Sequence, residues 1–254
     1  MKYLNPIYRY FHFILLFGIF HSTINAQTLN KNYLSDDVEN LINSNPNQAL
    51  KIAQYLLSKT NTSDADKSRI NFLISKAYIA KGDYSTALNF LYEEKNYKKY
   101  LNEEQKINID VSKITLLRNL TLDLQSKKIL EKLENTTVSE AKLKSYLEIV
   151  IALEKAKFLM NENKTQEGID ILITLQSDVA AITKDFKEIS ISYSTTLGEL
   201  YLKDKNLPEA QKQFEAAIEK LNQQNVDNLY AKITALHGLA TVYFLKKSML
   251  RQQH

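Results

Sequence analysis

A helix-turn-helix pattern recurs along this chain at intervals of about 40 residues, and this periodicity constrains the fold more than any other feature. In each copy, a small residue that we call the marker is followed four positions later by an apolar residue, so both lie on one side of a helix. The markers stand 38, 39, 42 and 42 residues apart, at Ala49, Ala87, Ser126, Gly168 and Ala210. A helix with one apolar stripe must bury it against a neighbour, so the repeat predicts stacked helical hairpins.

The clearest copy runs from residue 191 to residue 224, and a second runs from about 68 to 101. In the first, Asn206 is a predicted helix cap and Pro208 falls in the first helical turn, where its missing N–H costs nothing. Small Gly198 is predicted to let two helix backbones approach closely. The residues that define the pattern are Leu197, Gly198, Tyr201, Ala210, Phe214 and Ala217 in one copy, and Tyr78, Gly82, Asp83, Tyr84, Ala87 and Leu91 in the other.

Those residues at those spacings resemble the tetratricopeptide repeat (TPR) family, in the long-repeat form found in exported bacterial proteins. The resemblance covers residues 27–247, strongly in these two units and weakly in three more, around 38–56, 107–133 and 147–175. The family's tryptophan and its closing proline are missing. The resemblance implies an all-α, right-handed TPR-like solenoid of antiparallel helix pairs, with about five units.

A sixth unit begins with Ile233, Leu236, Leu239, Ala240 and Tyr243, and no second helix is predicted after it. Residues 248–254 are expected to form a tail. Two explanations stay open: a lone capping helix, or a chain cut short of its natural continuation. Tyr78, Tyr201 and Tyr243 fall on the packing position of the repeat, so we expect them in the core.

Residues 1–26 are typical of a cleaved signal peptide. Lys2 and Arg9 precede an apolar run at 10–20, and Ala26 ends a plausible cleavage site. A membrane anchor would need about 20 apolar residues, so no membrane span is expected beyond the signal peptide. Because an exported chain without cysteine fits a bacterial envelope, we expect a periplasmic location. A secreted or membrane-anchored protein is the alternative if the chain is a fragment.

Composition argues against an enzyme. The chain has no cysteine, and its two nearest glycines, Gly168 and Gly198, stand thirty positions apart, which excludes glycine-rich phosphate loops. His237 is the one histidine left in a helical context, too little for a metal site or a catalytic triad. We therefore expect no catalytic residue, cofactor or metal. Without residues 1–26 the net charge is +2, and no basic patch indicates nucleic-acid binding.

In the TPR family, partners bind along the concave face, which the first helix of each unit lines. Placed residue by residue on this sequence, the family's positions give a candidate partner-binding set with five cations and one acid: Arg69, Phe72, Lys76, Arg118, Asn119, Lys157, Asn161, Glu199 and Lys203. This set suits an extended or helical peptide with some negative charge. A solvated face without a specific ligand is the alternative.

The sequence thus favours a non-enzymatic protein- or peptide-interaction module, a scaffold or adaptor, in the bacterial periplasm. The competing hypothesis is the periplasmic sensory segment of a membrane-anchored signalling protein that carries a DNA-binding or histidine-kinase domain. The partner and the oligomeric state stay open.

Overall fold

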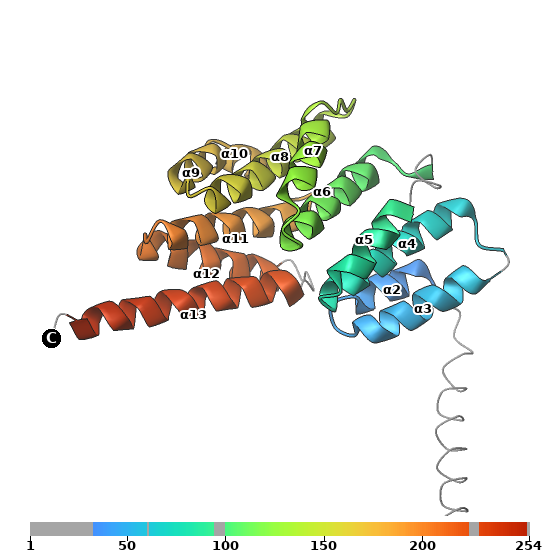
Figure 1. The fold of residues 1–254 in the computed structure, drawn as a ribbon, viewed down its shortest axis with the longest axis horizontal. Coiled ribbons are helices and arrows are strands. Elements are labelled where there is room, and N and C mark those ends of the chain that lie inside the picture. The colour runs from blue at the N-terminus through green and yellow to red at the C-terminus, as the bar shows by residue number, and fades with distance from the viewer. Residues whose placement is uncertain (1–32, 60, 94–99, 224–228, 253–254) are drawn as a thin grey trace, which may run out of the picture. The chain divides into compact units, whose positions relative to one another are not determined.

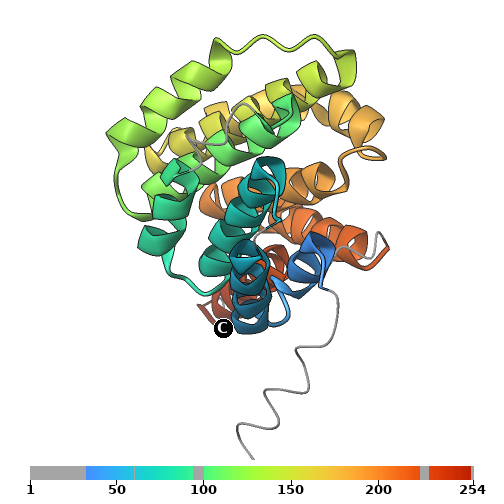
Figure 2. The same cartoon turned by 90° about the vertical axis from the view of Figure 1, so that its right-hand side faces the viewer.

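Helix is the regular secondary structure throughout the residues that the computed structural model describes, which are 33–59, 61–93, 100–223 and 229–252. No strand occurs among them (Figures 1 and 2), so the expected all-α fold is confirmed. The predicted signal peptide, residues 1–26, lies outside the described residues. From Ser35 onward the chain forms one compact unit.

The helices follow one another as hairpins (Figure 1). Consecutive helices contact each other within the pairs α2–α3, α4–α5, α6–α7, α8–α9 and α11–α12, and α12 also contacts α13. Short α10 packs against α8, α9 and α11. The helix bounds are α2 Ser35–Leu41, α3 Pro46–Ser58, α4 Asp64–Ala80, α5 Tyr84–Glu93, α6 Glu103–Asn119, α7 Asp123–Glu134, α8 Ala141–Asn161, α9 Thr165–Thr174, α10 Gln176–Ile182, α11 Lys187–Lys203, α12 Leu207–Gln223 and α13 Leu229–Gln252.

A left-handed residue recurs in the turn between the two helices of a pair. The backbone angle φ is +76° at Gly82, +59° at Thr121, +62° at Asn163 and +63° at Lys205. These residues are 39, 42 and 42 positions apart, the same intervals that separate the marker residues from Ala87 onward. The backbone therefore repeats with the sequence, and the chain has a helical-repeat fold.

Polar side chains define where several helices begin. Asn45 accepts a hydrogen bond from the Gln48 backbone N–H (3.1 Å) and Pro46 occupies the first turn of α3. The Asn206 side chain accepts from the backbone N–H of Glu209 (3.4 Å) at the start of α12. These contacts satisfy N–H groups that a helix leaves unpaired at its start. The cap predicted beside Pro208 is therefore present, and Asn45 beside Pro46 forms one of the same kind.

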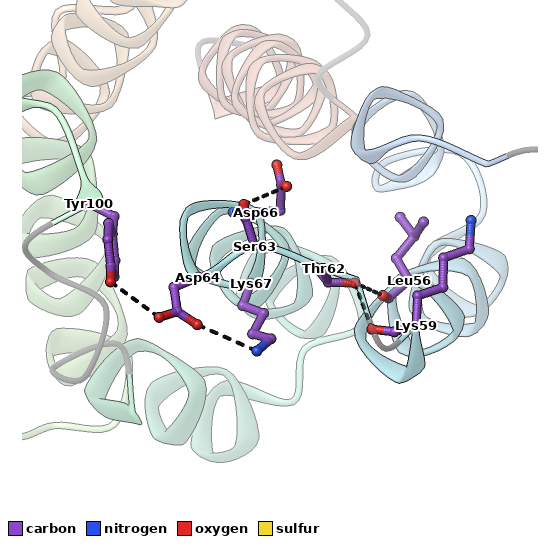
Figure 3. Close-up of polar contacts among 8 residues, drawn as sticks. All are labelled: Leu56, Lys59, Thr62, Ser63, Asp64, Asp66, Lys67 and Tyr100. Atoms are coloured by element: carbon purple, nitrogen blue, oxygen red, sulfur yellow. Dashed lines mark hydrogen bonds and ion pairs between the residues drawn. The ribbon is translucent and has the colours of Figure 1, made fainter.

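Figure 3 shows how side chains fix the connection between α3 and α4. The Thr62 hydroxyl donates to the carbonyl oxygen of Leu56 (2.8 Å) at the end of α3. The next residue, Ser63, caps α4 by accepting from the Asp66 backbone N–H (3.1 Å). The Tyr100 hydroxyl, close before α6, donates to the Asp64 carboxylate (3.2 Å). The first turn of α4 is thus tied to the segment that leads into the next hairpin.

The ring of Phe214 on α12 lies between two glycines that come from different helices. A Cβ at Gly198 of α11 would lie 2.8 Å from this ring, and one at Gly238 of α13 would lie 2.3 Å from it. Side-chain atoms do not approach so closely in well-packed interiors. Gly198 therefore makes room for an aromatic ring, and not simply for a helix backbone as the sequence suggested.

Two expectations about the last helix are wrong. Tyr243 is 51% exposed and not part of the core, because α13 is packed on one side only, where Ala235 and Val242 are buried with Phe214. Residues 248–252, expected in a tail, continue α13 as helix. Tyr78 and Tyr201 are half-buried and pack against core clusters.

The recurring turn leads to a stability prediction. Gly82→Ala should lower the free energy of unfolding by about 1 kcal/mol, since an L side chain strains a backbone with positive φ. A Cβ at this position would meet no atom within 4 Å, so crowding adds nothing. Thr121→Gly should raise the free energy of unfolding by about 0.5 kcal/mol, because a β-branched residue is strained at positive φ. Urea unfolding measures both, and effects of the same sign would contradict the prediction.

Candidate functional site

The nine residues predicted to bind a partner all lie on α4, α6, α8 and α11, the first helices of four hairpins. Helix α8 contacts both α6 and α11, so three of these helices form a continuous layer. We call seven residues on this layer the polar face: Arg118, Asn119, Glu154, Lys157, Asn161, Glu199 and Lys203.

The three predicted residues on α4 are engaged locally. The Arg69 guanidinium forms ion pairs with Asp36 (2.7 Å) and Glu39 (3.2 Å), both on α2. The Lys76 ammonium lies 5.9 Å from the centre of the Phe72 ring on the same helix, within cation–π range. Arg69 therefore joins α4 to α2, and its charge is already compensated.

A buried ion-pair cluster lies at the centre of the polar face. The Glu154 carboxylate, only 2% exposed, accepts a hydrogen bond from the Arg118 guanidinium of α6 (2.6 Å) through one oxygen. Its other oxygen accepts from the Lys157 ammonium (2.7 Å), one turn further along α8. Both carboxylate oxygens are thus paired, which a buried carboxylate requires. The cluster joins two consecutive hairpins.

The neighbouring positive charges decide the direction in which the pKa of Glu154 shifts. Burial by itself would raise the pKa of the Glu154 carboxyl, but the charges of Lys157 and Arg118 and their hydrogen bonds outweigh it, so the pKa is lowered. Glu154 is therefore ionised at neutral pH. Conversely, the positive charges of Arg118 and Lys157 are partly used inside the protein and are less available to a partner than the sequence indicated.

The Glu199 carboxylate on α11 differs from that of Glu154 in its contacts and in the direction of its pKa shift. Its half-buried carboxylate forms no hydrogen bond or ion pair with any described residue. Burial raises its pKa, and the nearby charges of Lys157 and Arg118 only partly oppose the shift. Glu199 stands 42 positions after Lys157 and takes the same place on its helix. A partly desolvated acceptor of this kind gains from a donor brought by a ligand.

Three exposed side chains repeat along one edge of the polar face. Asn119, Asn161 and Lys203 are the last residues of α6, α8 and α11, and each is 42 positions from the next. The Lys203 ammonium donates to the carbonyl oxygen of Met160 (2.7 Å) at the end of α8, where carbonyls lack helical partners. The amides of Asn119 and Asn161 have no partner among the described residues and offer both donors and acceptors.

Sequence reasoning missed Glu154. The repeat positions taken from the family place Lys157 on the face but not Glu154, three positions earlier on the same helix. One signal was present, since Glu154 is a lone acid in the apolar stretch that runs from Ile149 to Ala156. Its partner Arg118 is 36 residues away, so the pair becomes visible only in the folded chain.

A polar contact between the first helices lies nearer the start of α6 and α8. The Tyr146 hydroxyl donates to the Asn108 side chain (2.6 Å), and its ring stacks on Phe186 at 4.4 Å between centres. Burial raises the pKa of Tyr146, so this hydroxyl stays protonated and serves as a donor. The contact fixes the same two helices that Arg118 and Glu154 join.

Within the described ranges, no three His, Asp or Glu side chains gather closely enough to hold a metal ion. None of the helices in those ranges is both long and apolar enough to cross a membrane. The polar face itself consists of hydrogen-bonding and charged groups suited to recognition.

Comparison with known proteins assigns no family. No protein-family model matches the chain, and no curated protein matches it. Among solved structures, the apo form of RapI resembles it with a TM-score of 0.44 and 9% identity. The match covers 91% of this chain and 66% of RapI. The helical-repeat fold is therefore established by the hairpins and their recurring turns, and not by this distant likeness.

The buried cluster predicts a strong effect of one substitution. Glu154→Gln should lower the free energy of unfolding at pH 7 by about 3 kcal/mol, because two half-buried cations lose their shared counter-charge. Since the pKa of Glu154 is lowered, its contribution is present above the ordinary carboxyl pKa and is lost as pH falls through the lowered value. The difference between the variant and the natural protein should therefore close in acid. Urea unfolding at several pH values measures it.

Glu162→Gln is the matched control. It removes an exposed ion pair, Glu162 with Lys127 at 2.7 Å, and should cost under about 1 kcal/mol. Equal losses in the two variants would show that the Glu154 cluster contributes no more than a surface pair.

Proposed function

We propose that this chain is a TPR-like, non-enzymatic module that binds a peptide segment of another protein on its polar face. The observation that carries the proposal is the half-buried Glu199 carboxylate, which has no hydrogen-bonded partner in the described part of the chain, near the ion-pair cluster of Glu154. A side chain that served stability alone would gain nothing from being partly desolvated and unpaired. A ligand group can complete this arrangement.

The chemistry of the polar face supports a peptide that brings hydrogen-bond donors. Arg118 and Lys157 are held by Glu154, and Lys203 by a carbonyl oxygen. The groups left to bind are Glu199 and the amides of Asn119 and Asn161. A peptide with a Lys or Arg for Glu199, and backbone groups for the amides, suits this set better than the acidic peptide that the five cations suggested.

The test is a peptide selection. Random 12-residue peptides are selected against the full mature chain, and their affinities are measured by fluorescence anisotropy. We expect basic residues to be enriched, and affinity to fall at least about tenfold in Glu199→Gln. Because the pKa of Glu199 is raised, affinity should also fall as pH decreases from 7 toward 5, and this dependence should vanish in the variant.

Glu167→Gln serves as the control, since Glu167 is an exposed acid on α9, outside the polar face. Lys157→Glu is a poor test, because it would place a second carboxylate against buried Glu154. Peptides whose affinity is the same in the Glu199 variant, at every pH, would exclude the polar face as the binding site.

We also propose that the chain is exported to the bacterial periplasm. The basic residues, apolar run and small residues within 1–26, together with the lack of cysteine, support this location.

Expression in a Gram-negative host followed by osmotic shock tests the location. The released protein should begin at Gln27, as measured by mass spectrometry, and Leu15→Arg should abolish release by interrupting the apolar run. Leu34→Arg, which follows the predicted cleavage site, is the control. Uncleaved protein in the cytoplasm would contradict export. In the cells that naturally make this protein, a much larger membrane-bound band on a blot with an antibody against residues 27–254 would favour the sensory alternative.

A further inference from the structure

Helix α13 has a second apolar face that points away from the rest of the protein. Its inner side is buried against α12 through Ala235, Gly238 and Val242. Apolar residues on the other side are exposed, and the first four of them recur every three or four positions. We call the set the outer stripe: Ile233, Leu236, Ala240 and Tyr243, then Phe244 next to Tyr243, and Leu250 six positions further. Phe244 is 71% exposed. This spacing is the pattern by which one helix packs against another.

Equivalent residues in the preceding hairpins show what packs against the outer side of such a helix. Ala156 of α8, Gly198 of α11 and Ala240 of α13 are 42 residues apart and take the same place on their helices. Ala156 is covered by Gly168 of α9, and Gly198 by Phe214 of α12. Ala240 is exposed, and no described helix covers it. The outer stripe thus presents the surface that a second helix occupies in the preceding hairpins.

The backbone of α13 stays helical at the position where the preceding hairpins turn. The four preceding hairpins each turn at a left-handed residue, the last of which is Lys205. Lys247 stands 42 positions after Lys205, at the equivalent place. Lys247 is helical, and α13 has 24 residues where α11 has 17. Figure 1 shows the added turns of α13 running on beyond α12. The stripe is therefore longer than the surface that α12 covers.

Charge indicates the nature of the occupant. Helix α13 contains four basic residues and no Asp or Glu. Lys246 donates to Gln211 of α12 (2.6 Å), while Lys232, Lys247 and Arg251 are exposed on the same side of α13 as the outer stripe and have no acidic partner among the described residues. A second copy that paired its own α13 here would bring like charges together, which disfavours self-association. Acidic groups beside an apolar stripe would complement it.

We infer that the outer stripe of α13 is a docking surface for an amphipathic helix of another protein, one with apolar residues every three or four positions and acidic residues beside them. This helix takes the place of the second helix in a hairpin, with an apolar side chain over Ala240 as Phe214 lies over Gly198. The surface is separate from the polar face and does not depend on peptide binding there.

The probe is a labelled synthetic peptide with the sequence of α12, residues 207–223, in which Lys212 and Lys220 are replaced by Glu. It keeps the stripe of Ala210, Phe214 and Ala217 and gains acidic flanks. We expect saturable binding to the full mature chain by fluorescence anisotropy, with a Kd on the order of 10 µM that rises with salt. A peptide whose acids are all replaced by Lys should bind at least about tenfold more weakly.

Two variants test the surface separately from the charge. Phe244→Ser should weaken binding at least about tenfold, while Leu124→Ser on α7, where the leucine is 67% exposed, should not. The double variant Lys247→Gln with Arg251→Gln should weaken binding and flatten its salt dependence, and the pair Lys128→Gln with Lys144→Gln should not. All four positions are exposed, so circular dichroism melting should be unchanged.

Several outcomes would overturn the inference. Binding that is absent up to about 1 mM peptide, or equally weakened by the Leu124 variant, would exclude the outer stripe. A dimer that Phe244→Ser dissociates would make a second copy the occupant. Binding to phosphatidylglycerol vesicles through Phe244, without peptide binding, would make it a membrane surface. Glu199→Gln should leave this binding unchanged, so a failure of this inference can be distinguished from a failure of the proposed function.

Discussion

The close contact between the two helices of each hairpin governs the rest of this structure. In the four hairpins from α4–α5 to α11–α12, a left-handed residue reverses the chain within a few positions. Small residues at the crossing, such as Ala156 against Gly168, let the helices pack closely. From α6 onward, the first helices of successive hairpins contact one another, α6 with α8, α8 with α11, and α11 with α13. Without a fixed register between these helices, Lys157 and Glu199 would not share one surface, nor would Asn119 and Asn161 end their helices at equivalent places.

The polar face follows from this register together with one buried charge. The Glu154 carboxylate is almost fully buried, and it is tolerated there because two cations from α6 and α8 satisfy both of its oxygens. The cluster therefore holds two cations on one carboxylate inside the protein, with a net charge of +1. What remains for a partner is the Glu199 acceptor and the asparagine amides, a set that differs in sign from the five cations counted along the sequence.

The terminal helices at the two ends of the described repeat pack differently. At the start, α2 is tied to α4 through Arg69, Asp36 and Glu39. At the other end, α13 covers Phe214 with its glycine-containing side and leaves its outer stripe to solvent. A helix with two apolar sides can close one packing layer and open another, and its lack of acidic residues limits which helices complement it.

The sequence by itself determined the all-α fold, the start of α12 at Asn206 and Pro208, and the helices that carry the candidate face. These features are local, because caps, proline positions and apolar spacing act within a few residues. Only the tertiary structure decided that Arg118 and Lys157 share Glu154, that Gly238 admits the Phe214 ring, and that Tyr243 is exposed. Such contacts join residues from different helices, and no pattern along one helix specifies whether a charge is already paired or a face already covered.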